Sequence, residues 1–177
     1  MMSSDILWFS GLWPLMRPMI FKSPEMSMIV DLDVACEDRV PEYPSFERWA
    51  HAACTKPDAE LSIRIVGLEE SAALNETYRH KKGPTNVLSF PCEVPEGVPC
   101  PLLGDLVICA PVVEKEALAQ EKSSEAHWAH MVIHGVLHLQ GYDHIETPDA
   151  ERMEALEVEI MARLGFANPY DDEDTPA

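Results

Sequence analysis

The sequence predicts a single domain of mixed helices and strands in layers, of the α+β or α/β class. Several segments alternate apolar and polar residues with the period of a half-buried strand, and between them lie segments whose apolar residues recur at helical spacing. With 177 residues, 46% of them hydrophobic, the chain is long enough for one well-packed core and short for two. Internal repeats and low-complexity segments are absent from the sequence.

The elements ahead of residue 123 are predicted from these two periodicities. In IVDLDV, for example, apolar residues alternate with aspartates, whereas Leu74 and Tyr78 lie four residues apart, as on one face of a helix. Pro111 suits the first turn of a helix. The predicted elements are a strand over 29–34, a helix over 43–54, a strand over 60–67, a helix over 68–79, strands over 85–91 and 104–110, and a helix over 110–122.

A helix that is buried around most of its circumference is predicted from Ala126 to Leu139. This segment contains no Asp, Glu, Lys or Arg. Ser123 or Ser124 can cap its N-terminus, with Glu125 in the first turn. The polar side chains of the helix are histidines, which fall within an arc of roughly 80° at about 100° per residue. They are His127, His130, His134 and His138.

The domain is predicted to occupy residues 28–170. Its last helix runs from Thr147 to Leu164, and Gly165 ends it. Residues 171–177 form an acidic tail that we expect to be disordered. Residues 1–27 contain an apolar run that is too short to cross a bilayer and lacks the basic start of a signal peptide. We expect a disordered leader or the product of an upstream start site, with a partner-docking or membrane-touching segment as the alternative.

Charge and cysteine content limit the classes of function. The formal net charge of -18 excludes nucleic-acid binding through a broad basic surface, so any such contact must be local. The 5 cysteines include no C-x-x-C pair, which argues against a disulfide framework and a thiolate zinc site. Free thiols are typical of a reducing cytoplasm, where we expect the protein to be located.

The strongest chemical signal is the segment HGVLHLQGYDH, residues 134–144. His134 and His138 lie one helical turn apart, so both imidazoles can reach one cation. Gly141 can end the helix and turn the chain back, which would bring His144 in as a third ligand. Three nitrogen ligands with one open position indicate a catalytic metal site. Zinc is expected, although three imidazoles also bind nickel, copper or iron.

The same histidine spacing occurs in zinc proteases, in which a glutamate follows the first histidine and acts as the base. Here that position is Gly135, so we expect little or no peptide hydrolysis. Within the helix, His127 is too far from His134 to share an ion, and His130 could at most line the pocket. Asp143 is expected to bond turn backbone or to orient a ligand imidazole.

Two further features are candidates for substrate contact and catalysis. Arg79, Lys81 and Lys82 lie within the densest basic cluster of the chain, which is either a solvated helix end or a phosphate clamp. Asp105 is a lone acid in a predicted strand and needs a cation, an imidazole or water as its partner.

Three motifs together resemble the YbeY family of bacterial rRNA maturation factors, which are metal-dependent endoribonucleases. They are LNETYRHKKGPTNVLSFP at 74–91, LLGDLVIC at 102–109 and HGVLHLQGYDHIE at 134–146, and the resemblance extends over about residues 28–170. It implies an α+β fold in which a single-layer mixed β-sheet packs with helices and carries a central metal-binding helix.

The resemblance also implies functional residues. The metal histidines of the family correspond to His134, His138 and His144, its important arginine to Arg79 and its strand acid to Asp105. Arg79 and Asp105 are therefore the catalytic candidates, and Arg79, Lys81 and Lys82 are the candidates for binding substrate. The chain departs from the family pattern at Lys82, where many members have an acid, and at Asn86, where many have an Asp.

The expected function is that of a zinc-dependent endoribonuclease that cleaves single-stranded RNA, with one Zn²⁺ per chain. The resemblance implies rRNA processing, including maturation of the 3′ end of 16S rRNA, and ribosome quality control. It also implies the ribosome or ribosomal proteins as partners. We expect no DNA and no membrane partner. The alternatives are a zinc metalloprotease and a non-catalytic ribosome assembly factor whose metal is structural.

Overall fold

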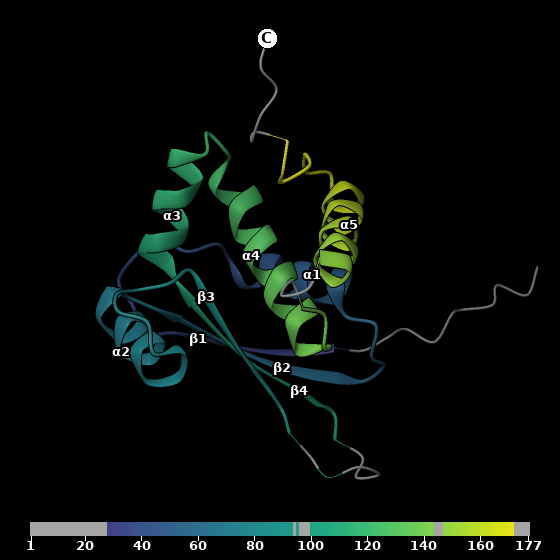
Figure 1. Cartoon of the computed structure of the whole chain (residues 1–177), viewed down its shortest axis with the longest axis horizontal. Coiled ribbons are helices and arrows are strands. Elements are labelled where there is room, and N and C mark those ends of the chain that lie inside the picture. Colours follow the sequence, from purple (N-terminus) through teal and green to yellow (C-terminus); the bar gives the residue numbers. More distant parts are fainter. Residues whose placement is uncertain (1–27, 94, 96–99, 144–146, 172–177) are drawn as a thin grey trace, which may run out of the picture.

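The computed structural model describes residues 28–93, 95, 100–143 and 147–171. The predicted leader, the acidic tail beyond Asp171 and the predicted ligand His144 therefore lie outside the described residues. In the described part, a β-sheet carries helices packed mainly on one face (Figure 1). The elements are β1 (Met28–Val34), α1 (Tyr43–Ala53), β2 (Ala59–Val66), α2 (Leu68–Arg79), β3 (Val87–Pro91), β4 (Leu102–Cys109), α3 (Ala110–Ala119), α4 (Ser124–Leu139) and α5 (Thr147–Leu164).

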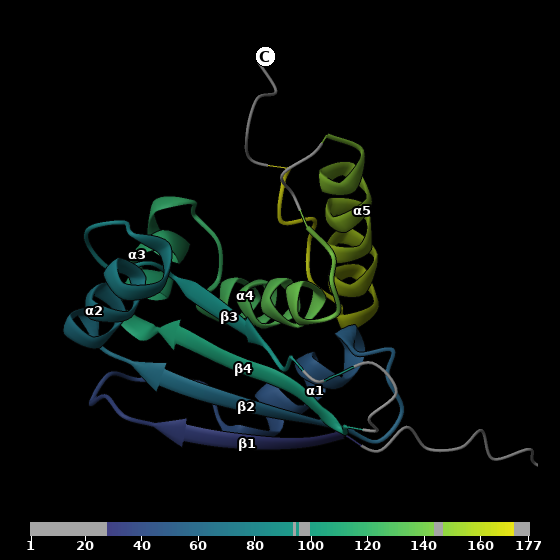
Figure 2. The same cartoon turned by 60° about the horizontal axis from the view of Figure 1, so that its bottom comes forward.

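The sheet is mixed, which confirms the predicted α+β class. Its strand order is β1-β2-β4-β3. β1, β2 and β4 are parallel, and β3 pairs antiparallel with β4 along the opposite edge from β1. Figure 2 shows α2 close to the end of the sheet at which the three parallel strands finish. Helix α4 lies over the sheet, and α5 lies toward the end at which these strands begin. Each predicted element is present, with bounds that differ by a few residues.

Helix α4 has the ends that the sequence predicts. The Ser123 side chain accepts a hydrogen bond of 3.2 Å from the Ala126 N–H and so caps the N-terminus. At the other end, Gly141 adopts a φ of 87°. The Tyr142 N–H then donates back to the Leu137 carbonyl at 3.2 Å, which closes the helix with a Schellman-type turn. Between these ends the helix is buried on most sides, as its uncharged sequence indicates.

Two glycines allow α4 to lie directly against the sheet. A Cβ at Gly135 would be 2.7 Å from Leu106 Cδ2 on β4. Gly104 has a φ of +146°, and a Cβ there would be 2.3 Å from the Phe90 carbonyl oxygen and 2.8 Å from Leu139 Cδ2. A glutamate in place of Gly135, as in the zinc proteases, would therefore collide with the sheet. The glycine is required by packing.

Helix α4 also packs on α1, through aromatic side chains. Phe46 makes edge-to-face contacts with Trp49 and Trp128, with ring centroids 5.5 Å and 5.7 Å apart. All three side chains are fully buried, so they anchor the N-terminal half of α4 in the core. Among the described helices, none has the length and apolar character needed to cross a membrane.

The close approach at Gly104 gives a test of this packing. Gly104→Ala should lower the free energy of unfolding by about 3 kcal/mol or more, because the new methyl group meets backbone and the φ is unfavourable for alanine. Gly67→Ala is the matched control, since a Cβ at Gly67 meets no atom within 4 Å and should cost less than about 1 kcal/mol. Denaturant unfolding measures both, and equal stability of the two variants would contradict the proposed close contact.

Candidate metal centre and its surroundings

His134 and His138 of α4 direct the same ring nitrogen at one point. Their Nε2 atoms are 3.1 Å apart, and the ring centroids are 4.5 Å apart. Two imidazole nitrogens that bind one zinc ion tetrahedrally at about 2.0–2.1 Å would lie roughly 3.3 Å from each other. The observed separation is close to that value, so the two side chains fit as ligands of a single cation.

The other nitrogen of each ring fixes the tautomer. His134 Nδ1 lies 2.7 Å from Glu157 Oε1, and His138 Nδ1 lies 2.9 Å from the Tyr142 carbonyl oxygen. A carbonyl and an ionised carboxylate only accept hydrogen bonds, so both Nδ1 atoms carry a proton and donate. In the neutral imidazoles, both Nε2 atoms then carry lone pairs that face each other. This pairing is unfavourable unless a cation or a proton lies between them, and it is the arrangement of metal-binding histidines.

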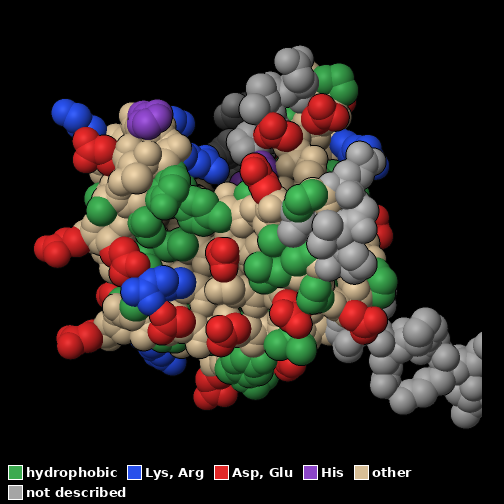
Figure 3. Space-filling model, turned by 90° about the horizontal axis from the view of Figure 1, so that it is seen from below, with side chains coloured by type: hydrophobic (Ala, Val, Ile, Leu, Met, Phe, Trp, Pro, Cys, Tyr) green, Lys and Arg blue, Asp and Glu red, His purple; other side chains and the backbone are tan. Residues whose placement is uncertain are grey.

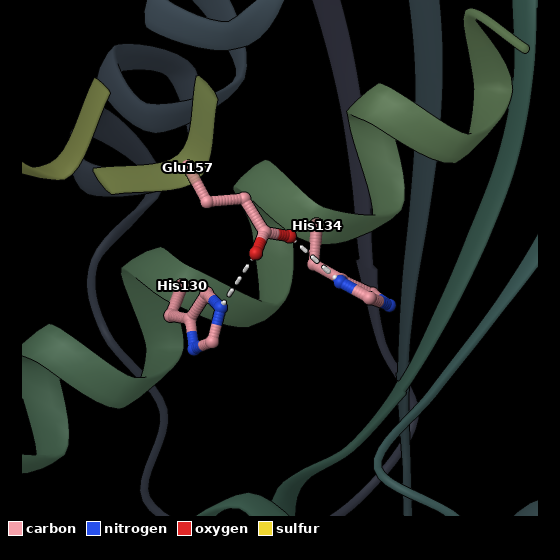
Figure 4. Close-up of side chains that lie close together, drawn as sticks. All are labelled: His130, His134 and Glu157. Atoms are coloured by element: carbon pink, nitrogen blue, oxygen red, sulfur yellow. Dashed lines mark hydrogen bonds and ion pairs between the residues drawn. The ribbon is translucent and has the colours of Figure 1, made fainter. Parts of the chain in front are cut away.

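Glu157 is a buried carboxylate at the centre of this arrangement. It projects from α5 and is 0% exposed. Burial acts to raise the pKa of Glu157, but hydrogen bonds from His130 and His134 outweigh it and lower the pKa to about 2, so the group is ionised. Figure 4 shows the carboxylate between the two imidazoles. His130 Nε2 lies 3.3 Å from Glu157 Oε2, and the Tyr170 hydroxyl donates to the same oxygen.

His130, His134 and Glu157 offer a second set of donor atoms, all within 4.8 Å of one another. We favour the pair of His134 and His138. The 2.7 Å between His134 Nδ1 and Glu157 Oε1 is a hydrogen-bond length, and it is shorter than the roughly 3.3 Å expected between two ligands of one tetrahedral ion. The Glu157 carboxylate therefore orients the His134 imidazole, and His130 contacts the same carboxylate. His144 lies outside the described residues, so the third ligand stays a prediction.

The basic residues lie where α2 ends. His80 takes a left-handed conformation with a φ of 56°, and Arg79, Lys81 and Lys82 are exposed on either side of it. The following loop is held in place by a hydrogen bond of 2.9 Å from the Asn75 amide to the Gly83 carbonyl. Figure 3 shows this group of Lys, Arg and His side chains next to a hollow in which another His side chain is visible. The basic cluster therefore lies in solvent at the C-terminal end of α2.

Within the described part of the chain, Asp105 lies away from His134 and His138. Leu106, the next residue of β4, contacts α4 at Gly135. Successive side chains of a strand point to opposite faces, so Asp105 lies on the face away from α4, where it is exposed to solvent. The contact with Nδ1 of His134 is made by Glu157.

Asn86, where the family commonly has an Asp, has a local structural function. Its amide nitrogen donates to the Glu116 carboxylate at 3.2 Å, and its amide oxygen accepts a hydrogen bond of 2.7 Å from the Val87 N–H. Glu116 in turn lies 2.9 Å from His127 Nε2. An aspartate at position 86 would place two carboxylates together. The His127 side chain thus belongs to a hydrogen-bond network separate from that of His134, in agreement with the predicted distance between the two residues.

Glu157 is the functional residue that the sequence reasoning missed. A signal was present, because Glu157 follows Met153 by four residues and precedes Ile160 by three, which places an acid within the apolar stripe of the last helix. The contact of His138 with the Tyr142 carbonyl has no such signal, since it involves backbone.

Comparison with known proteins agrees with the motifs. The family model described as "Endoribonuclease YbeY" matches residues 37–165. A relative named "Endoribonuclease YbeY" from Methylococcus capsulatus strain Bath is 64% identical over 144 residues, which cover 80% of this chain and 96% of the relative. The solution structure of TM1509 from Thermotoga maritima superposes with a TM-score of 0.50 at 24% identity, covering 84% of this chain and 97% of that one, and is similar in fold.

The two candidate ligand sets make different predictions for metal content. His134→Ala and His138→Ala should each remove the metal, expected at about one ion per chain, whereas His130→Ala should retain at least part of it because His130 is no ligand in our assignment. His127→Ala is the control for replacing a buried histidine of α4. Elemental analysis of protein purified without chelating resin measures the content. Loss of metal from the His130 variant with full retention by the His138 variant would reverse the assignment.

Glu157→Gln tests the orientation of His134. The variant keeps the size of the side chain but removes the charge that holds the Nδ1 proton, so metal affinity should fall by about 10- to 100-fold. Glu116→Gln is the matched control, because Glu116 also holds a histidine of α4 but lies in the separate network with His127. Competition with a metal indicator gives both affinities. An unchanged affinity in Glu157→Gln would mean that the carboxylate serves stability alone.

Proposed function

We propose, because this chain belongs to the YbeY family of endoribonucleases, that it cleaves single-stranded RNA with the help of a zinc ion held by His134, His138 and His144. The proposal of a metal site rests on one observation. The Nε2 atoms of His134 and His138 are 3.1 Å apart, while the Nδ1 atom of each ring donates a hydrogen bond to another group. A bound divalent cation would supply positive charge that stabilises a phosphate as its negative charge grows.

Arg79 is the proposed phosphate clamp. It is exposed at the end of α2, and a guanidinium can hold two phosphate oxygens at once. Lys81 and Lys82 add positive charge along the same loop, which suits the backbone of an RNA strand. Asp105 has no part in this proposal, because its side chain lies on the other face of the sheet.

The absence of an acid at Gly135 favours RNA over peptide as the substrate. A peptide bond requires a base to activate water, and Gly135 is packed against Leu106 with no room for a larger side chain. Each phosphodiester of RNA carries a neighbouring 2′-hydroxyl, so groups that stabilise charge on the phosphate can promote cleavage with less help from a protein base. DNA lacks this hydroxyl and should be spared.

The charge of the whole protein suggests where the RNA comes from. With a net charge of -18, the chain should bind free RNA weakly and with strong dependence on salt. Useful affinity would then come from a second contact, and we propose that the ribosome or a ribosomal protein supplies it during rRNA maturation and quality control. We propose that the protein acts in the cytoplasm.

Three matched substrates test the assignment. The metal-loaded protein should cleave single-stranded RNA, leave DNA of the same sequence intact and leave unfolded casein intact, and a chelator should abolish the RNA cleavage. His138→Ala is the control for a contaminating nuclease, since it should be inactive with a folded core. Casein cleavage that depends on His138, together with untouched RNA, would favour the protease instead.

Arg79→Lys separates a two-point clamp from simple charge. RNA cleavage should fall by about tenfold or more, because an ammonium acts as a point charge and cannot hold two oxygens in fixed positions. Arg48→Lys is the control, since Arg48 is an exposed arginine on α1 that lies 3.6 Å from Glu125 at the start of α4. Rates are compared at one salt concentration. Wild-type activity in Arg79→Lys would mean that Arg79 contributes only its positive charge.

A further inference from the structure

Tyr78 is an aromatic side chain that the fold leaves in solvent. It occupies the last turn of α2 and is 61% exposed. Its ring meets Phe90 of β3 edge to face, with centroids 5.0 Å apart and planes at 73°. Such a contact fixes the orientation of a ring and leaves much of its area available. The two side chains therefore form a rigid aromatic surface at the edge of the sheet.

This aromatic pair adjoins the basic cluster on the face of the sheet away from α4. Tyr78 directly precedes Arg79 in the chain. On β3, Ser89 faces α4, since its hydroxyl lies 3.5 Å from the Gly135 carbonyl oxygen, so the next residue, Phe90, faces away from α4 opposite Asp105 of β4. Figure 3 shows a group of hydrophobic side chains immediately beside the Lys, Arg and His group at the end of α2.

We propose that Tyr78 and Phe90 form a stacking subsite for one unpaired base of the RNA strand, beside the basic cluster and on the face of the sheet away from the metal helix; this subsite rests on the proposed function. Proteins that hold single-stranded nucleic acid combine cations along the backbone with aromatic rings on which bases stack. Both components occur here side by side. Arg79, Lys81 and Lys82 complement the phosphates that flank such a base.

Stacking would also allow this strongly acidic protein to bind RNA without a large positive surface. A protein with a net charge of -18 gains little affinity for RNA from its overall field. Stacking on an aromatic ring contributes to binding without requiring net positive charge, and it selects unpaired bases because paired bases are already stacked. The subsite therefore gives a physical basis for preference for single strands, with little dependence on base identity.

Tyr78→Leu and Tyr78→Trp test the subsite in the metal-loaded full-length protein. The Leu variant should raise KM for single-stranded RNA cleavage by about 5- to 100-fold, with kcat nearly unchanged, because it removes stacking that is present throughout the reaction. The Trp variant should retain the wild-type KM. Leu118→Ala, at a residue 81% exposed on α3, is the control for removing an exposed apolar side chain.

A binding measurement separates this inference from the cleavage reaction. A DNA strand with a single 2-aminopurine should lose fluorescence on binding to wild type and to Tyr78→Trp, and should keep it with Tyr78→Leu. Wild-type KM and quenching in Tyr78→Leu would overturn the subsite, while RNA cleavage that depends on His138 would still support the proposed function. A Tyr78→Leu defect that appears only with ribosomal particles and never with free RNA would also overturn it, in favour of a protein partner. Thermal unfolding confirms that each variant is folded.

Discussion

The contact of helix α4 with strand β4 is the constraint on which the rest of the structure depends. Gly135 has no side chain, so the helix backbone lies against Leu106, and Gly104 allows Leu139 to approach the sheet in the same way. A helix held at this distance cannot rotate or slide without a collision. The aromatic cluster of Phe46, Trp49 and Trp128 also holds this helix against α1. The rigid position of α4 fixes the directions of His134 and His138.

Rigid placement of the helix alone would not prepare the histidines for a metal. Each ring could still rotate and exchange its proton between nitrogens, so the partners of Nδ1 are required. Glu157 and the Tyr142 carbonyl remove that freedom, because each accepts the Nδ1 proton. A buried carboxylate is costly unless it is hydrogen-bonded, and Glu157 receives donors from His130, His134 and Tyr170. Tyr170 comes from the segment after α5, so the last described turn of the chain supports the site.

The acidic character of the protein and its nucleic-acid chemistry are compatible because their groups are separated in space. The open face of the sheet carries acids such as Asp31 and Asp105, whereas the cations at the end of α2 adjoin the hollow beside α4 (Figure 3). A single strand of RNA needs only a narrow path to reach the metal centre, and local contacts suffice for it. A paired or extended nucleic acid would meet repulsion from the surrounding carboxylates.

The sequence by itself determined the element order, the buried helix with its caps, and the pair of His134 and His138, because periodicity, capping and i, i+4 spacing are local properties of the chain. It also pointed to the family through its motifs. It did not determine which face of the sheet Asp105 occupies, since that depends on pairing between strands distant in sequence. Nor did it identify the partner of Glu157, because the place of this acid in the apolar stripe of α5 indicates burial but does not show what the carboxylate contacts. Only the packing of α5 on α4 buries that carboxylate against His134, because a hydrogen bond between residues 23 positions apart is set by the approach of two helices.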